Sequence, residues 1–246
     1  MSKTQIITIA EIKGGTGKTT TAAVIAQAAA LDNKRVLLID LDAQANLTTL
    51  FGADPTAPGA FNILEGFPVL DAIQETELNV DVIAGAPNLA TIKTSKGSLY
   101  RLQNAIEPII NNYDLIIIDT PPALSDLTFN ALQASNGLLI ALDANISALQ
   151  GFYHITDLAK AAKQQNKKLK VLGCIITRYN PRPVISRELR DIIAEKAQAV
   201  KCPLLCEIRQ GVAIQEAQAY RKNLFTYAPK SKPAQDYKEL YNKIFK

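Results

Sequence analysis

IKGGTGKTT, at residues 12–20, follows an apolar, β-branched run at residues 5–10 (QIITIA) and precedes a small-residue, helix-compatible stretch at residues 21–31 (TAAVIAQAAAL). Strand, glycine-rich turn and helix form the context in which such a loop binds phosphate. The glycines allow a tight turn that directs several backbone N–H groups into one concavity. The following helix adds its own unpaired N–H groups and its positive dipole end. We therefore predict a nucleotide site with contacts from Lys13, Gly14, Gly15, Thr16, Gly17, Lys18, Thr19 and Thr20.

Two side chains of this loop carry the expected chemistry. Lys18 is expected to place a positive charge on the β- and γ-phosphates of a nucleotide. The hydroxyl of Thr19 is expected to complete the coordination of a Mg²⁺ ion, which prefers oxygen ligands. The predicted ligands are therefore ATP and Mg²⁺.

The spacing of the loop departs from the standard phosphate-loop pattern, G-x-x-x-x-G-K-[ST]. With Gly17 as the second glycine, the first would stand at position 12, which is Ile12. The chain instead carries a second lysine, Lys13, directly before Gly14. This K-G-G-x-G-K-T-T form resembles the deviant Walker A motif of the ParA/MinD ATPase superfamily. The resemblance implies that Lys13 reaches across a nucleotide-sandwich homodimer to the phosphates held by the other copy.

The composition fits a soluble globular protein. Of 246 residues, 48% are hydrophobic and 20% are charged, which is enough chain for a sizeable core. No apolar run approaches the ~20 residues of a membrane span, and the N-terminal MSKTQIITIA lacks a signal-peptide cleavage pattern, so we expect a cytoplasmic protein. The three cysteines include no Cys-x-x-Cys pair, which argues against a disulfide framework and a metal cluster.

Apolar, strand-like runs alternate with helical patterns along the whole chain. We expect strands near residues 5–10, 36–40, 80–83, 115–119, 138–143, 171–177 and 203–208, and helices near 21–31, 98–111, 126–135, 149–165, 184–200, 211–220 and 233–245. The alternation predicts a single α/β P-loop NTPase domain over residues 1–246. Its central sheet is expected to be mostly parallel, with seven or eight strands and helices on both faces.

Three aspartates stand where predicted strands end. Asp40 ends VLLID, Asp42 follows it by two residues, and Asp119 ends LIIID. Ligands bind at the carboxyl ends of strands in open α/β sheets, so these carboxylates are expected to converge on the triphosphate and its Mg²⁺. The residues alone leave two alternatives open: Asp119 as the cap of a turn, and the Asp40–Asp42 pair as an exposed acidic turn.

The segments around these aspartates extend the resemblance. YDLIIIDTPPALSDLTFNAL (residues 113–132) resembles the Walker B region of the ParA family, which implies that Asp119 holds Mg²⁺ directly or through water. DLDAQAN (residues 40–46) resembles the family's Asp-x-Asp-Pro-Gln-Gly-Asn segment, with Ala43 and Ala45 in place of Pro and Gly. The resemblance implies that Asp40 lies near the Mg²⁺ shell and that Asp42 orients the attacking water. Lys13, Lys18 and Asp42 are thus the predicted catalytic residues, and Thr19, Asp40 and Asp119 the predicted metal site.

The predicted strand VLGCIIT leads to the region where members of this family contact adenine and ribose. Thr177 and Arg178 stand at that position, and the resemblance implies that they make these contacts. Arg178 is equally compatible with a solvated loop charge.

The C-terminal third carries most of the excess positive charge of a chain whose net charge is +4. Residues 208–240 resemble the ParA/Soj partition ATPases, with Arg, then Glu-Ala, then Tyr-x-Pro-x-Ser, then Ala-x-x-Tyr. In that branch the ATP-bound dimer binds double-stranded DNA without sequence preference through basic residues. The matching and neighbouring positions are Arg209, Arg221, Lys222, Lys230 and Lys232. The alternative for each is an ordinary surface charge.

The resemblance implies an ATP-dependent, dimerising ATPase that drives plasmid or chromosome partition on the nucleoid. A centromere-binding, ParB-like adaptor protein is expected to stimulate its slow, Mg²⁺-dependent hydrolysis. The short segment before the loop leaves no room for a helix-turn-helix, so the expected DNA binding is nonspecific. The rival reading is a MinD-like positioning ATPase that binds membranes through the amphipathic stretch YKELYNKIFK (residues 237–246). We expect that stretch to pack as the last helix of the domain instead, without a membrane partner.

Overall fold

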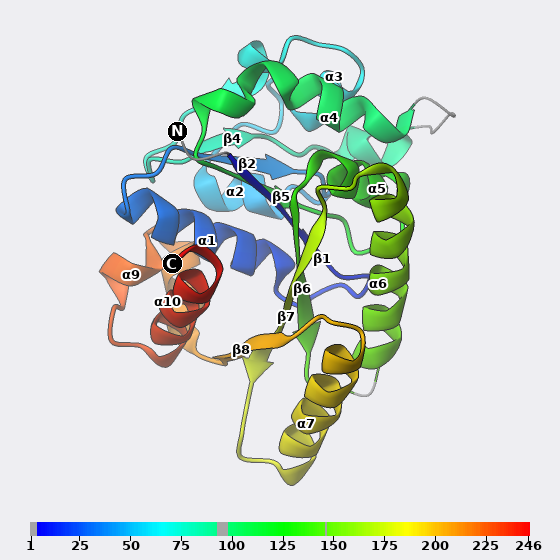
Figure 1. Cartoon of the computed structure of the whole chain (residues 1–246). Helices are drawn as coiled ribbons and strands as arrows, with labels where there is room; N and C mark the ends of the chain where they lie inside the picture. Colours follow the sequence, from blue (N-terminus) through cyan, green and yellow to red (C-terminus); the bar gives the residue numbers. More distant parts are fainter. Residues whose placement is uncertain (1–3, 93–97, 146) are drawn as a thin grey trace.

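A computed structural model describes residues 4–92, 98–145 and 147–246 of the chain (Figure 1). Its strands are β1 (Gln5–Ala10), β2 (Val36–Asp40), β3 (Ile73–Gln74), β4 (Asp81–Ile83), β5 (Leu115–Asp119), β6 (Gly137–Asp143), β7 (Lys170–Tyr179) and β8 (Leu204–Arg209). Its α-helices are α1 (Lys18–Leu31), α2 (Asn46–Phe51), α3 (Ala60–Leu64), α4 (Arg101–Ile106), α5 (Asp126–Ala134), α6 (Ala148–Gln165), α7 (Val184–Ala199), α8 (Val212–Ala219), α9 (Leu224–Tyr227) and α10 (Lys232–Phe245). Its 3₁₀ turns are η1 (Val69–Ala72), η2 (Pro87–Thr91), η3 (Ser98–Tyr100) and η4 (Glu107–Asn112).

The strands form one eight-stranded sheet in the order β3-β4-β2-β5-β1-β6-β7-β8. All its described pairings are parallel except that of the two-residue β3 with β4 at the edge. The predicted fold class, a mostly parallel sheet between helices, is therefore confirmed. The short antiparallel β3 gave no recognisable pattern in the sequence because two residues cannot show alternation.

Helices cover both faces of the sheet because its inner strands are apolar on both sides. Strand β5 is fully buried, which is why LIIID shows no polar alternation. Ile7, Ile9 and Leu38 face a core with α1, α2, α8, α9 and α10. Leu37 and Ile118 face the opposite core, which α3, α4 and α5 cover, and α6 and α7 continue that layer over β6 and β7. Figure 1 shows α1, α9 and α10 on one side of the sheet and α5 and α6 on the other.

The predicted helix over residues 98–111 is wrong in its extent. The structure has η3, a short α4 and then η4, which contains Pro108. Proline has no N–H to donate and crowds the preceding turn, so the α-helix ends before it. Three short helices, α2, α3 and α9, were not predicted, because four to six residues carry too little periodicity.

The C-terminal α10 packs into the domain, as predicted. Tyr237, Leu240 and Tyr241 are buried in the core that α10 shares with α1 and β8. The hydroxyl groups of Tyr237 and Thr21 are 3.1 Å apart and hydrogen-bond between α10 and α1. Much of the apolar face that a membrane-bound helix would need is thus already used inside the protein. Within the described ranges, no helix is both long and apolar enough to cross a bilayer.

Candidate nucleotide-binding site

The candidate site lies at the carboxyl ends of the three central strands β2, β5 and β1. Asp40 at the end of β2 pairs in register with Asp119 at the end of β5, and Ile9 of β1 pairs with Asp119 from the other side. The glycine-rich loop follows β1 directly and leads into α1. The fold therefore brings the predicted loop and two of the predicted carboxylates to one edge of the sheet.

The loop has the backbone that its glycines predict. Gly15 and Gly17 have φ values of 74° and 82°, in the left-handed region where a side chain is strained. A Cβ on Gly17 would also lie 3.2–3.3 Å from the side chain of Thr177. Gly17 is the N-cap of α1 and no side chain caps the helix, so the first N–H groups of α1 stay available for an anion.

Lys18 is buried at the start of α1, with 5% of its surface exposed. Its Nζ donates to the carbonyl oxygen of Lys13 at 3.4 Å. Burial lowers the pKa of Lys18, while the carboxylates of Asp119, Glu11 and Asp42 act in the opposite direction. A buried amine beside the helix N-terminus is a suitable partner for a phosphate oxygen.

Asp119 and Thr19 form the pair expected of a metal site. The Thr19 hydroxyl donates to Oδ2 of Asp119 at 2.6 Å, and Oδ1 is buried with no partner among the described residues. Burial, followed by the nearby charge of Asp40, raises the pKa of Asp119 to about 8. A buried, unpartnered carboxylate oxygen is a position that a cation stabilises, so these residues fit Mg²⁺.

The protein supplies only part of such a coordination shell. Among the residues that the structure describes, no three His, Cys, Asp or Glu side chains form a cluster able to hold a metal. Mg²⁺ usually keeps several waters and binds one or two protein oxygens together with substrate phosphates. Thr19 and Asp119 are thus suited to a metal that arrives with a nucleotide.

Asp40 and Asp42 differ although only one residue separates them. Asp40 is fully buried, and its oxygens accept from the N–H of Asp42 at 3.0 Å and from the N–H and hydroxyl of Thr48 at 3.0 and 2.8 Å. Burial raises the pKa of Asp40. The Asp42 carboxylate is only partly buried and accepts from the N–H of Gln44 at 3.0 Å. Asp40 therefore shapes the loop that presents Asp42.

The unusual Ala45 of this loop adopts a glycine-like conformation. Its φ of 51° and ψ of 35° lie in the left-handed region, immediately before α2. Glycine adopts this conformation without strain, which fits the glycine of the family's segment, whereas Ala45 holds it at a cost of about 1 kcal/mol.

A cavity of about 640 Å³ adjoins the loop and is large enough for a nucleotide. Its lining includes the predicted loop residues from Gly14 to Thr20 together with Asp42, Thr177 and Arg178. Thr177 donates to the carbonyl oxygen of Thr16 at 2.6 Å, so its hydroxyl braces the loop. Arg178 pairs with Asp143 at 2.6 Å. Both predicted base contacts thus lie at the cavity, and both side chains already have protein partners.

Lys13 differs from Lys18 in pointing outward. Its side chain is exposed, and its Nζ donates to the Ser147 hydroxyl at 3.2 Å, at the N-terminus of α6. The Ser147 hydroxyl in turn donates to Asn145. The two lysines of the loop therefore occupy different environments, one inside its own site and one at the surface.

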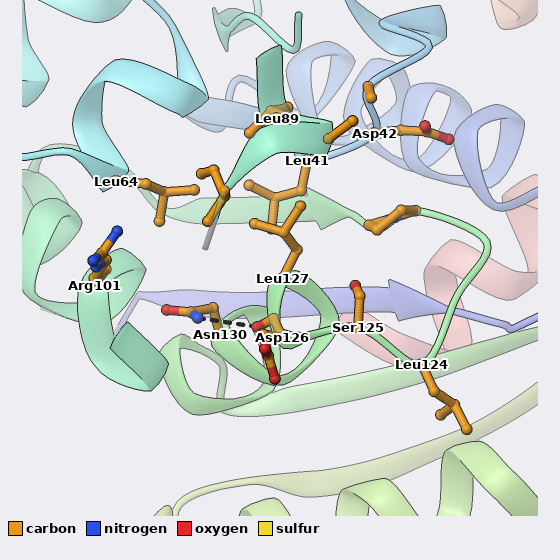
Figure 2. A pocket seen from close by; sticks show the side chains of 14 residues that line it. Leu41, Asp42, Leu64, Leu89, Arg101, Leu124, Ser125, Asp126, Leu127 and Asn130 are labelled. Atoms are coloured by element: carbon orange, nitrogen blue, oxygen red, sulfur yellow. Dashed lines mark hydrogen bonds between the residues drawn. The ribbon is translucent and has the colours of Figure 1, made fainter. Parts of the chain in front are cut away.

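A second cavity of about 380 Å³ lies beside Asp42, between the loop after β2 and the segment after β5 (Figure 2). Leu41, Leu64, Leu89 and Leu127 give it an apolar wall. In Figure 2 the Asp42 carboxylate points away from these leucines. The two loops that border the nucleotide site thus also form the walls of this smaller cavity.

Comparison with known proteins agrees with this geometry. A family model described as an AAA domain matches residues 4–171. The chain is 32% identical to the chromosome-partitioning ATPase Soj of Thermus thermophilus, over 99% of this chain and 96% of Soj. The chain belongs to the ParA/Soj family of partition ATPases. As a member of this family, it is a P-loop ATPase.

Solved structures show the same fold with nucleotide bound. A protein described as a plasmid partition protein of Borrelia burgdorferi, bound to AMPPNP, has a TM-score of 0.83 at 26% identity, with 98% of both chains covered. The septum site-determining protein MinD of Pyrococcus horikoshii, with Mg-ADP, has a TM-score of 0.79 at 29% identity, covering 99% of this chain and 96% of MinD. The ParA/Soj and MinD branches share this fold, so the fold alone does not separate them.

The predicted DNA-binding residues of this ParA/Soj chain differ in their surroundings. Arg209 lines the nucleotide cavity, and its guanidinium and N–H donate to Asp236 at 2.5–3.1 Å. Lys232 lines a neighbouring groove of about 410 Å³ that also includes Arg209 and Arg182. The other three are exposed: Arg221 and Lys222 in the turn after α8, and Lys230 before α10.

Three features of the site were missed in the sequence. The hydroxyl of Thr48 donates to Asp40 and accepts a hydrogen bond from the N–H of Gly85 at 2.8 Å, so it links these two residues. A Cβ on Gly85 would lie 2.8 Å from Cγ of Asp40, so the glycine is needed for this close approach. Glu11, directly before the loop, is buried beneath it. These residues act through contacts between distant segments, which local patterns do not reveal.

Proposed function

We propose that this ParA/Soj protein is an ATP-driven DNA-segregation switch. The observation that carries the proposal is the nucleotide cavity, which joins the P-loop, the buried Lys18 and the partly exposed Asp42 in one space. Phosphoryl transfer requires mainly positioning and neutralisation of charge. These residues supply both.

Within one site, Lys18 and the N–H groups at the start of α1 bind the β- and γ-phosphates. Thr19 and Asp119 hold Mg²⁺, which neutralises phosphate charge when it is bound. Asp42, held at its loop position by Asp40 and Thr48, accepts a hydrogen bond from the attacking water and orients it. Thr177 and Arg178 border the part of the cavity that receives the base and ribose.

The dimer is proposed to form through Lys13. Its side chain is exposed and turned away from Lys18, so it is available to a second copy of the chain. In a two-fold arrangement of ATP-bound copies, each Lys13 contacts the phosphates in the opposite site. Dimerisation then depends on ATP, because the phosphates form part of the interface.

The ATP-bound dimer is proposed to bind double-stranded DNA nonspecifically on the nucleoid. Exposed Arg221, Lys222, Lys230 and Lys232 are available for phosphate contacts. Arg209 is the weakest candidate, since Asp236 already neutralises it. A ParB-like adaptor bound to a centromere-like site is proposed to stimulate hydrolysis and release the dimer.

Sedimentation with random-sequence duplex DNA tests this proposal. Full-length protein is mixed with DNA or with anionic liposomes at low salt, each with AMPPNP, ADP or no nucleotide. We expect cosedimentation with DNA in AMPPNP alone and none with liposomes. Binding to liposomes without DNA binding would reject the partition function in favour of a membrane role.

A further inference from the structure

Glu11, the last residue before the P-loop, is a buried carboxylate with unusual surroundings. Only 2% of its surface is exposed. Its Oε1 accepts from the N–H of Ile12 at 2.8 Å and from the N–H of Lys13 at 3.4 Å. Its Oε2 is buried without a partner among the described residues. A carboxylate loses much of its hydration in such a position, so it needs a specific role or a specific compensation.

Helix α6 has a glycine, and therefore no side chain, at the position that faces the Glu11 carboxylate. Gly151, in the first turn of α6, lies so close that a Cβ there would overlap Oε1 of Glu11 and lie 3.1 Å from its Cδ. Glycine is unfavourable inside a helix, and here its lack of a side chain creates the space for the carboxylate. Glu11 and Gly151 therefore form a fitted contact between the P-loop and α6.

Lys13 contacts the start of α6 directly through its amine and indirectly, by way of Glu11, through its backbone. Its backbone N–H donates to Oε1 of Glu11, the same oxygen that lies against Gly151. Its Nζ donates to the hydroxyl of Ser147. The N–H of Gly151 in turn donates to the carbonyl oxygen of Ser147 at 3.4 Å. Glu11 thus holds the backbone of Lys13, and Ser147 at the start of α6 holds its amine.

The charge balance is consistent with this arrangement. Burial raises the pKa of Glu11, whereas the hydrogen bonds from Ile12 and Lys13 and the charges of Lys18 and Lys13 favour its ionised form. The ionised carboxylate can therefore hold the N–H groups of Ile12 and Lys13 through charge-assisted hydrogen bonds.

We propose that Glu11 is a positioning residue for Lys13: seated against Gly151, its carboxylate fixes the first peptides of the P-loop and directs the Lys13 side chain out toward a second copy. The importance of this direction for dimerisation rests on the proposed function. The positioning itself belongs to the single chain and is testable without a dimer.

Acylation of lysines in the nucleotide-free protein, followed by mass spectrometry, tests the positioning directly. In Glu11→Ala and in Gly151→Ala, Lys13 should react about threefold faster than in the wild type, because its contact with Ser147 is loosened. Lys222 serves as the internal reference. Glu11→Gln keeps an acceptor oxygen for both N–H groups and should restore most of the wild-type rate. Unchanged Lys13 reactivity in both alanine variants would overturn the proposal.

The two alanine substitutions also test each other. Alanine has a higher helix propensity than glycine, so Gly151→Ala is not expected to weaken α6 itself. Its methyl group displaces Glu11 only if Glu11 is present, so it should have no further effect in the Glu11→Ala background. Fully additive effects would show that the two residues act separately and would overturn the proposal. Tyr153→Ala, an exposed position on α6, is the matched control.

Sedimentation velocity with AMPPNP then links positioning to dimerisation. Glu11→Ala and Gly151→Ala should weaken the dimer about tenfold while the affinity for ADP stays within about threefold of the wild type. An equal loss of ADP affinity would show that Glu11 only shapes the site of its own chain, which overturns the proposal. If the wild type itself stays monomeric while Lys13 reactivity changes as expected, the positioning is confirmed and the proposed dimer is wrong.

Discussion

The phosphate-binding edge of the sheet and the basic C-terminal region carry the two halves of the proposed function, and they are built differently. At the phosphate edge, Lys18, Asp40 and Asp119 are buried, and each is fixed by hydrogen bonds to neighbouring segments. In the C-terminal region, Lys222 and Lys230 are exposed. A reaction centre needs fixed geometry, whereas nonspecific phosphate contacts need only charge at a surface. Single substitutions should therefore have large effects at the edge and small ones in the basic region.

Lys18→Ala is expected to have the largest effect. It removes the buried amine at the N-terminus of α1, and nucleotide affinity should fall at least about 100-fold, since a charge-assisted contact to phosphate is lost. Fluorescence titration with a labelled ADP measures the change. Lys167→Ala, at an exposed position, is the control for loss of one positive charge. Binding within threefold of the wild type would contradict the assignment of the P-loop.

Asp42→Ala is expected to separate binding from turnover. The carboxylate lies at the edge of the cavity, and its one contact among the described residues is with the exposed N–H of Gln44, so ATP should still bind. Loss of water orientation should slow hydrolysis by roughly 100-fold or more. A phosphate-release assay measures the rate. Normal hydrolysis by this variant would remove Asp42 from the catalytic residues.

Asp40→Ala and Asp42→Ala should differ in their effects on the stability of the protein, although the two residues belong to the same loop. Both N–H groups and the hydroxyl that donate to Asp40 would lose their acceptor in a buried site. We expect a loss of about 2–4 kcal/mol in unfolding free energy, measured by urea denaturation. Asp42→Ala in the same assay should differ from the wild type by less than about 0.5 kcal/mol. Equal stabilities would show that Asp40 does not shape the loop.

These contrasts also show what the sequence could predict. The P-loop, Asp119 and the parallel sheet were predictable because each depends on residues close in sequence: a glycine spacing, a strand-terminal aspartate, an unbroken apolar run. The contacts among Asp40, Thr48 and Gly85, and between Glu11 and Gly151, were not. They join segments that only the folded sheet brings together.

The basic region shows the opposite problem. The sequence identifies each arginine and lysine, but it does not show which carboxylate or other group each side chain contacts. Arg209 matched the family position for DNA binding, and the structure pairs it with Asp236, which lies 27 residues further along the chain. The sequence cannot distinguish a paired guanidinium from a free one. Asp236 lies next to Arg209 only because α10 packs on β8 in the folded chain.

Arg209→Ala should therefore affect stability more than a surface charge does. It leaves the Asp236 carboxylate, which is largely buried, without its cation. Because the arginine itself is partly exposed, we expect a loss of about 2 kcal/mol, less than for a fully buried pair. Thermal unfolding at matched pH and salt measures it. A variant as stable as the wild type would indicate that Arg209 is free for another ligand.

Lys222→Ala and Lys230→Ala should change DNA binding without changing the fold. Each removes one exposed charge, so unfolding free energy should move by less than about 0.5 kcal/mol. If each lysine contacts one phosphate, the slope of log K against log salt concentration should fall by about 0.9 per substitution. Fluorescence anisotropy with random duplex DNA and AMPPNP measures the slope. An unchanged slope in both variants would remove these lysines from the DNA interface.

Ala45→Gly should have the smallest effect on the unfolding free energy. Whether the variant is more or less stable than the wild type is the informative result. Ala45 holds a left-handed φ of 51° in the loop that presents Asp42, a conformation that glycine adopts without strain. Relief of that strain, offset by the greater freedom of glycine in the unfolded chain, should stabilise the protein by about 0.5 kcal/mol. Urea denaturation measures the gain, and ATP turnover should stay within twofold of the wild type. A destabilised variant would mean that the methyl group of Ala45, which is only 7% exposed, makes a packing contact worth more than the backbone strain.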